Sequence, residues 1–281
     1  MTAPYIQNEI PFYKLSPGGN TTILVPARAV PAAKRAETAR RLMDPLHLGA
    51  EQVGFIDLAG EMPSLEMMGG ELCGNACRAL AALRVMLAAD EFTDWPVTGN
   101  LHSSGTDALV AWRVRPASGE AAALDAAVRI TLAHAAVTEL EPGLRRVDMP
   151  GIVHVLLDET LHPAPRDAAA EAAAWRRKLN LQDLPAVGCI RHAPLDAPAQ
   201  YITPLVWVRD TDSSCPETAC GSGTLALGLA LHLHSGQSCV HIRQPSGAHI
   251  AVDLEQDSSG ILHGWIGGPV RLIAQGKTYY W

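Results

Sequence analysis

Short apolar runs dominate the hydrophobic pattern of this chain, and a few helical stretches separate them. Runs rich in β-branched residues or with alternating apolar positions predict strands. These strands are expected at 21–25, 51–58, 97–116, 127–135, 146–158, 200–209, 239–243, 249–254, 261–272 and 276–281. Helix-forming residues with a polar outer side predict surface helices at 31–43 and 168–179. Two apolar stretches, Cys77–Leu87 and Leu225–Leu233, predict further helices, and the second is apolar on nearly all sides, which is typical of a buried helix.

The predicted elements fall into two similar halves. Each half contains several strands, few surface helices and one apolar helix that follows a cysteine. This pattern predicts an α+β fold of two pseudo-symmetric domains, each a mixed sheet curled around a central helix. Small residues gather around 118–127, so we place the domains at 1–122 and 123–267. The last strand, 268–281, is expected to complete the first domain.

Composition and charge narrow the class of protein. A chain of 281 residues with 48% hydrophobic content can bury the cores of two ordinary domains. The formal charge of −7 argues against a nucleic-acid partner. No stretch reaches the ~18 consecutive apolar residues of a membrane span, and the first residues lack the apolar run of a signal peptide. Six cysteines without paired spacing fit a reducing compartment, so we expect a cytoplasmic protein without a membrane partner.

Two short motifs with nearly the same sequence precede the apolar helices. One is Glu-Leu-Cys-Gly-Asn-Ala at 71–76, and the other is Thr-Ala-Cys-Gly-Ser-Gly-Thr at 218–224. Each places a cysteine, Cys73 or Cys220, at a helix N-terminus, where unpaired N–H groups and the helix dipole favour a thiolate and lower the thiol pKa. The repetition predicts two reactive thiols that face one cleft.

The other cysteines have a simpler interpretation. Free cysteine usually packs as a small buried hydrophobe. We expect this of Cys77, Cys189, Cys215 and Cys239. A metal site is not predicted, because the chain has neither a Cys-x-x-Cys motif nor the usual zinc spacing of His and Cys. A Cys73–Cys220 disulfide could form on oxidation.

Two opposed thiols are suited to inverting a carbon centre. A substrate carboxylate held by the amides of Gly74, Asn75, Gly221 and Ser222 would place its α-carbon between the sulfurs. One thiolate would remove the α-proton, and the opposite thiol would return a proton to the other side. Glu217 could hold the substrate ammonium group. The four lysines lack a phosphate-binding context, so we expect no imine cofactor.

Three polar residues near the start of the chain are candidate substrate contacts. Asn20 lies in a strong turn signal and either stabilises that turn or contacts the substrate. Glu51 and Gln52 open a buried strand, where they are either solvated or directed into the cleft.

The two cysteine motifs resemble the catalytic motifs of the diaminopimelate epimerase superfamily. That resemblance implies two similar halves, each a sheet around a central helix, and catalysis by Cys73 and Cys220. The sequence Met-Pro-Gly-Ile-Val-His at 149–154 is similar to that family's Met-Gly-Asn-Pro-His stretch, which implies a substrate contact at His154. Ser64 stands where the epimerases have a substrate-binding Asn, and Arg209-Asp210 replaces their Glu-Arg pair, which argues against diaminopimelate as the substrate.

A closer resemblance is to the histidine racemases of staphylopine-type metallophore biosynthesis. It rests on segments 17–25, 51–56, 73–76, 244–247 and 276–279, together with Glu217. The resemblance implies a cofactor-independent histidine racemase. We expect it to bind a small amino-acid substrate and to form a homodimer. The alternatives are another epimerase or isomerase of the same fold, and a redox or ligand-binding protein that uses the two thiols without catalysis.

Overall fold

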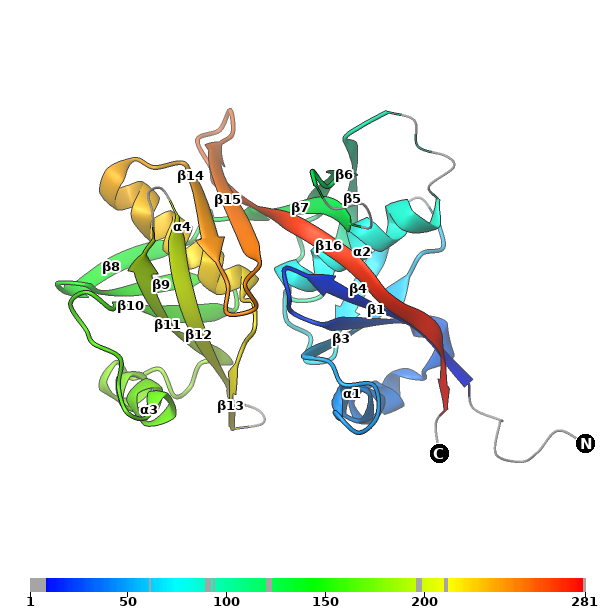
Figure 1. The fold of residues 1–281 in the computed structure, drawn as a ribbon, viewed down its shortest axis with the longest axis horizontal. Helices are drawn as coiled ribbons and strands as arrows, with labels where there is room; N and C mark the ends of the chain where they lie inside the picture. The colour runs from blue at the N-terminus through cyan, green and yellow to red at the C-terminus, as the bar shows by residue number, and fades with distance from the viewer. Residues whose placement is uncertain are drawn as a thin grey trace, which may run out of the picture. The chain divides into compact units, whose positions relative to one another are not determined.

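The computed structural model describes residues 9–60, 62–88, 92, 94–119, 123–195, 199–209 and 212–279 (Figure 1). The described chain forms two compact units. Unit 1 contains the residues up to Val128 and those from Gly267 onward, and unit 2 contains Arg129–Ile266. The chain leaves unit 1 within strand β7 (Ala123–Thr131) and returns within β16 (Leu262–Tyr279). The predicted boundary at 122 lies outside the described residues, and the two compact units divide within β7, between Val128 and Arg129.

Unit 1 is built on a closed ring of eight strands. Neighbouring strands in the ring follow the chain order from β1 to β7 and continue to β16, and β16 pairs antiparallel with β1 to complete the circle. β2 pairs parallel with β3, and β4 pairs parallel with β5. The strands introduced here are β1 (Glu9–Pro17), β2 (Thr22–Pro26), β3 (Gln52–Asp57), β4 (Ser64–Met67), β5 (Val97–Ser103) and β6 (Val110–Pro116). This arrangement removes both edges of the sheet.

Helix α2 (Gly74–Leu87) packs against the strands β1 to β6 of this ring (Figure 1). Its Ala- and Leu-rich sequence favours a helix, and every residue from Asn75 to Leu83 is buried. Helix α1 (Arg35–Met43) follows two short 3₁₀ turns, η2 (Ala27–Ala29) and η3 (Ala32–Lys34). It buries one stripe against a cluster that includes Val25 and Phe55.

Unit 2 is a row of strands with a helix on each side. From β16 the order is β15 (His249–Gln256), β14 (Cys239–Arg243), β12 (Gln200–Val208), β11 (Ala186–Pro194), β10 (Ile152–Asp158), β9 (Leu144–Met149) and β8 (Ala136–Glu141), and the short β13 (Ser213–Pro216) pairs with β12. Helix α3 (Ala168–Lys178) packs on a cluster containing Val153, Val155 and Leu157. Because side chains alternate along β10, His154 and Leu156 face the other side of the sheet. Helix α4 (Gly221–Ser235) packs against β9, β10, β14 and β15.

Several predicted elements differ from the observed ones. The single strand expected at 146–158 is a hairpin, because Gly151 turns the chain with a φ of +79° between β9 and β10. The polar loop expected at 210–217 contains β13, although residues 210 and 211 lie outside the described residues. The two strands expected at 261–272 and 276–281 are one continuous strand, β16, which is described as far as Tyr279.

The helices give no sign of a membrane span. Among the described residues, no helix combines the length and the apolar character needed to cross a bilayer.

Candidate active site

Both motif cysteines are the N-cap residues of the apolar helices. Cys73 precedes α2 with φ −118° and ψ 107°, and its Sγ accepts a hydrogen bond from the Ala76 N–H at 3.4 Å. Cys220 precedes α4 with φ −117° and ψ 106°, and its Sγ accepts from the Gly223 N–H at 3.3 Å. The prediction that each cysteine stands at a helix start is confirmed, and the two motifs have the same local conformation in separate units.

The Cys73 thiol lies beside one of the predicted polar residues. Its Sγ donates a hydrogen bond to Gln52 Oε1 over 2.9 Å. Glu51, the preceding residue, accepts a hydrogen bond from Asn20 Nδ2 at 3.1 Å. Asn20 is fully buried, and its Oδ1 accepts from the Thr22 hydroxyl at 3.3 Å. The structure therefore brings Gln52 to the sulfur, whereas Asn20 orients Glu51.

The turn before Cys73 is supported from the β5–β6 connection. Ser104 Oγ donates to the Glu71 carbonyl at 2.8 Å and accepts from the Met67 N–H at 2.9 Å. Gly105 has a φ of +74°, and a Cβ at this position would lie 2.2 Å from the backbone nitrogen of Leu72. The sequence predicts a turn at these residues, but nothing in the local pattern shows that it supports the cysteine.

A charged side chain lies inside the apolar helix α2. Arg78 is fully buried, and its Nε donates to the Ala126 carbonyl at 2.9 Å. Its Nη1 donates to the Asn75 side-chain oxygen at 3.2 Å. Burial lowers the pKa of the Arg78 guanidinium to about 10, and the negative charges of Asp125 and Cys73 act against this shift. Sequence reasoning missed Arg78, although one arginine in an otherwise apolar helix is the signal that could have found it.

The Cys220 cap is held by a buried glutamine, Gln244, which the sequence analysis included in the segment 244–247 without assigning it a role. Gln244 Oε1 accepts from the Cys220 backbone N–H at 3.0 Å, and its Nε2 donates to Thr224 Oγ1 at 3.0 Å. The Thr224 hydroxyl in turn donates to the Cys220 carbonyl at 2.5 Å. These bonds fix the backbone on both sides of the sulfur.

The predicted pKa shift of the second cysteine is wrong in sign. Burial raises the pKa of the Cys220 thiol well above its usual value, and the Glu217 carboxylate adds to the rise through its charge and a hydrogen bond from the thiol. Hydrogen bonds from Ser222 and the Gly223 N–H act in the opposite direction but are weaker. Removal from water therefore outweighs the helix terminus at this position.

Four further predicted residues directly follow the two cysteines in the chain. Gly74 and Asn75 are the first residues of α2, and Gly221 and Ser222 are the first residues of α4. Their N–H groups therefore belong to the helix ends that suit an anion.

His154, which the resemblance implies as a substrate contact, is fully buried in unit 2. Burial lowers the pKa of its imidazole to about 3. Neither ring nitrogen has a hydrogen-bond partner in the described part of the chain. The ring lies over Gly188, where a Cβ would come within 2.1 Å of its Nδ1. On the same side of β11, Ile190 reaches the first turn of α4 at Gly223.

The prediction of buried packing holds for two of the four remaining cysteines. Cys77 and Cys189 are buried, and burial raises the pKa of each thiol to about 12. Cys215 and Cys239 are exposed, so the prediction is wrong for them. Cys215 lies on the short strand β13, and Cys239 occupies an outward position of the alternating strand β14. All six cysteines are free thiols.

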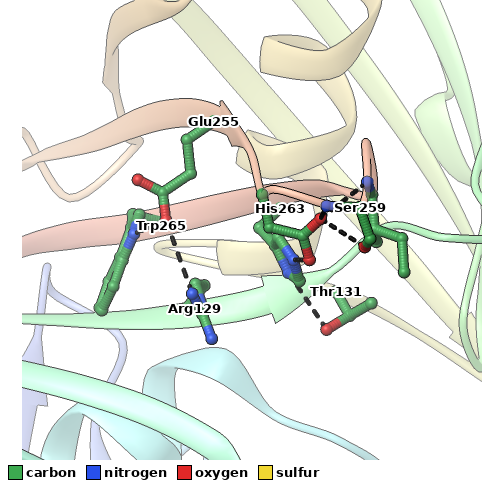
Figure 2. A network of polar contacts seen from close by, with 8 residues as sticks. Arg129, Thr131, Glu255, Ser259, His263 and Trp265 are labelled. Atoms are coloured by element: carbon green, nitrogen blue, oxygen red, sulfur yellow. Dashed lines mark hydrogen bonds and ion pairs between the residues drawn. The ribbon is translucent and has the colours of Figure 1, made fainter.

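A polar cluster in unit 2 joins β7, β15 and β16. Figure 2 shows His263 beside Thr131, and Glu255 beside Arg129 and Trp265. His263 Nε2 lies 2.9 Å from Asp257 Oδ2, and its Nδ1 lies 3.3 Å from Thr131 Oγ1. The Asp257 carboxylate also accepts bonds from its own turn, at Ser259 and Ile261. These contacts hold the turn at 257–260 against β7.

No metal centre is formed by the residues that the structure describes, because they contain no group of three or more His, Cys, Asp or Glu side chains arranged to hold an ion. A cavity of about 310 Å³ lies in unit 1, but its walls contain none of the predicted site residues. It is lined by Ile10, Thr38, Arg41, Leu42, Asp44, Leu46, His47, Thr278 and Tyr279.

Comparison with known proteins first defines the class. The fold is shared with a solved hydroxyproline epimerase from Agrobacterium vitis, with a TM-score of 0.66 over 97% of this chain and 93% of that chain, at 11% identity. That structure shows the fold, and here each unit carries a cysteine cap on its central helix. Together with the family match and the relatives described next, this defines an isomerase of the racemase and epimerase class.

Within this class, the chain belongs to the histidine racemase family. The family model described as "Histidine racemase CntK N-terminal domain" matches residues 9–279. A histidine racemase of Fusobacterium nucleatum is 30% identical over 95% of this chain and 96% of that protein. A histidine racemase of Staphylococcus aureus is 26% identical over 96% of this chain and 97% of that protein. The resemblance to histidine racemases stated from the sequence is confirmed.

Proposed function

We propose that the protein racemises histidine without a cofactor, by proton transfer between the substrate and two cysteines. The observation that carries this proposal is the repeated cysteine cap, Cys73 on α2 and Cys220 on α4, in a chain of the histidine racemase family. The choice of histidine rests on the relatives that share most of the chain's length.

The proposed chemistry uses one cysteine on each side of the α-carbon. The substrate carboxylate binds the first N–H groups of the helices, at Gly74 and Asn75 or at Gly221 and Ser222. One thiolate removes the α-proton, and the fixed N–H donors stabilise the charge that develops on the carboxylate. The other thiol then gives its proton to the opposite side of the carbon. The base ends as a thiol and the acid as a thiolate, so their roles exchange in the reverse reaction.

Three acidic or amide side chains are the proposed substrate contacts near the sulfurs. Glu217 carries a negative charge close to Cys220, which suits the substrate ammonium group. Gln52 contacts Cys73 Sγ, and its amide can accept a bond from the thiol or donate one to the thiolate. Glu51, oriented by Asn20, is the proposed third contact.

His154 remains a proposed substrate contact, but it differs from the other three because its side chain is a buried, neutral imidazole. It is buried and neutral, and its ring nitrogens have hydrogen-bonding capacity that the described residues do not use. The predictions of a homodimer, a cytoplasmic location and a part in metallophore synthesis stay predictions.

The proposal is tested by α-hydrogen exchange. Protein dialysed against a metal chelator and a carbonyl reagent is incubated in D₂O with L-histidine, D-histidine or another L-amino acid, and NMR follows the α-proton. We expect exchange with both histidine enantiomers, and loss of at least about a thousandfold in Cys73→Ser and Cys220→Ser because a hydroxyl is a far weaker base.

Cys215→Ser is the matched control, since Cys215 is an exposed thiol outside both caps. It should keep the wild-type rate. Full turnover in either cap variant would contradict the two-cysteine mechanism, and exchange with another amino acid but not histidine would contradict the substrate. Activity that is lost on dialysis and restored by pyridoxal phosphate or zinc would contradict cofactor independence.

A further inference from the structure

The environments of the two cap cysteines differ in charge. The Cys220 thiol donates a hydrogen bond to the Glu217 carboxylate, which favours the protonated form of the thiol. Cys73 Sγ lies 2.9 Å from the neutral amide of Gln52, which can accept a bond from the thiol or donate one to the thiolate. Cys73 also interacts with the buried guanidinium of Arg78. A cation near a thiol favours the thiolate, whereas a carboxylate opposes it.

Arg78 is unusual for a residue in the centre of a buried helix. It is fully buried, yet its Nη2 has no hydrogen-bond partner within the described residues. Its Nε bond to the Ala126 carbonyl would suffice to join α2 to β7. A charged side chain with an unsatisfied donor is expensive to bury, so a purely structural role would be served better by an apolar residue.

Arg78 also contacts a residue in the first turn of helix α2. Its Nη1 donates to the Asn75 side chain, and Asn75 is the second residue after the Cys73 cap. The charged groups that act on Arg78 are Cys73, at the cap of its own helix, and Asp125, on β7. The Asp125 carboxylate is already paired with Arg115, at 2.8 and 2.9 Å, which reduces its hold on Arg78.

We propose that Arg78 is a positioning residue that keeps Cys73 ionised in the resting protein, so that Cys73 is the resting base and Cys220 the resting acid. The assignment of base and acid rests on the proposed function, but the effect of Arg78 on the Cys73 thiol does not. The Arg78 guanidinium holds Asn75 and supplies positive charge to the first turn of α2. With its pKa near 10, the guanidinium is charged at neutral pH.

The test measures the ionisation of Cys73 without any substrate. Full-length protein is treated with iodoacetamide between pH 5.5 and pH 10, and peptide mass analysis gives the alkylation rate of Cys73 and its midpoint pH. Arg78→Met removes the charge, and Arg78→Lys keeps a charge without the forked contacts. We expect the Cys73 midpoint to rise by about one pH unit or more in Arg78→Met and by less in Arg78→Lys.

Two further variants keep the test decisive. Arg84→Met removes the other arginine of α2, a half-buried residue in the last turn of the helix, and should leave the Cys73 midpoint in place. Asp125→Asn removes the competing negative charge and should lower the midpoint, and it serves if Arg78→Met does not fold. An unchanged midpoint in folded Arg78→Met, or a higher one in Asp125→Asn, would overturn the proposal. Alkylation that depends on Arg78 in a protein that exchanges no α-proton would instead refute the proposed function alone.

Discussion

The absence of a side chain at Gly223 leaves room for the Cys220 sulfur. A Cβ at Gly223 would lie 3.2 Å from Cys220 Sγ and 2.8 Å from Ile190 Cδ1. Further along the same helix, a Cβ at Gly228 would lie 2.7 Å from Val252 Cγ1. The two glycines therefore meet similar steric limits, and Gly223 alone of the pair borders the cap cysteine.

We expect Gly223→Ala to lower kcat by about tenfold to a hundredfold, because an added methyl displaces the sulfur from its place on the helix. Gly228→Ala is the matched control and should lose stability, by about 1–3 kcal/mol, with kcat nearly unchanged. Steady-state racemisation and urea unfolding of both variants separate the two effects. Equal kcat values in the two variants would show that the position of Cys220 Sγ tolerates this change.

The buried imidazole of His154 makes stability depend on pH. Its pKa is about 3 in the folded protein and near 6.5 in the unfolded chain, so the unfolded chain binds the proton more tightly. The stability that the neutral His154 side chain contributes is fully present above pH 6.5, and it is lost as the pH falls from about 6.5 toward 3. Between pH 7.5 and pH 5.5, we expect this group to remove about 1–2 kcal/mol of stability.

Urea unfolding at pH 7.5 and pH 5.5 checks this expectation. His154→Leu should lose less stability between these pH values than the wild type, because its side chain does not titrate. His134→Gln is the control, since His134 is exposed, and it should follow the wild type. Identical pH dependence in His154→Leu and wild type would contradict the buried neutral histidine.

At the scale of elements, the buried Arg191 links helix α3 to the sheet of unit 2 by an ion pair. The side chain of Arg191, on β11, is only 6% exposed and pairs with Glu159 at 3.0 Å and with Glu171 of α3 at 2.7 Å. It also donates to the His162 carbonyl. Loss of one member of such a buried group leaves the others without a counter-charge.

Arg191→Met should therefore destabilise the protein by about 3–5 kcal/mol. Lys178→Met is the control, because Lys178 is an exposed α3 residue with a 3.9 Å ion pair to Glu141, and it should change stability by no more than about 0.5 kcal/mol. Chemical unfolding gives both values, and hydrogen exchange should show faster exchange in α3 of Arg191→Met. A loss below 1 kcal/mol would contradict a central role for Arg191.

The elements that the sequence predicts well are those with strong local signals. The cysteine caps, the apolar helices and the Ala-rich helix α3 follow from short patterns. Strands β1, β4, β8 and β11 are absent from the prediction. β1 contains two prolines, β4 is only four residues long, β8 is mostly exposed, and β11 carries a glycine, an arginine and a histidine. Their pairing depends on partners that a local pattern does not contain.

The site residues also divide into those with a local sequence signal and those that depend on long-range contacts. Cys73, Cys220 and Gln52 were found from motifs and strand position, and the structure places Gln52 against Cys73. Arg78 was missed, and Gln244 was noted only as part of the segment 244–247, because their importance comes from contacts with residues 48 and 24 positions away. The raised pKa of Cys220 was also missed, since burial is a property of the folded unit.

At the scale of the whole molecule, unit 1 is completed by a strand from the far end of the chain. The pairing of β1 with β16 places Glu9 opposite Tyr279 in an antiparallel register. A two-residue Asn-Gly turn could therefore join Tyr279 to Glu9 as a hairpin. A rearranged chain of 267–279, the turn and 9–128 would contain all eight strands of the ring in unit 1.

We expect this rearranged chain to fold cooperatively, whereas 9–128 alone should not, because it lacks one strand of the closed ring. A chain with residues 267–279 in scrambled order is the matched control. Thermal unfolding followed by circular dichroism and the dispersion of NMR amide signals distinguish them. A cooperative transition in 9–128 alone, equal to that of the rearranged chain, would show that β16 is dispensable for unit 1.

The late position of β16 has a consequence during protein synthesis. The 138 residues of unit 2, from 129 to 266, leave the ribosome before the strand that closes unit 1. At bacterial or eukaryotic elongation rates, this interval lasts about 7 to 28 seconds. Through that time β1 exposes an unpaired edge on the nascent chain, and such edges attract other chains. Unit 2 can complete its folding first, so the order of synthesis favours the second half of the molecule over the first.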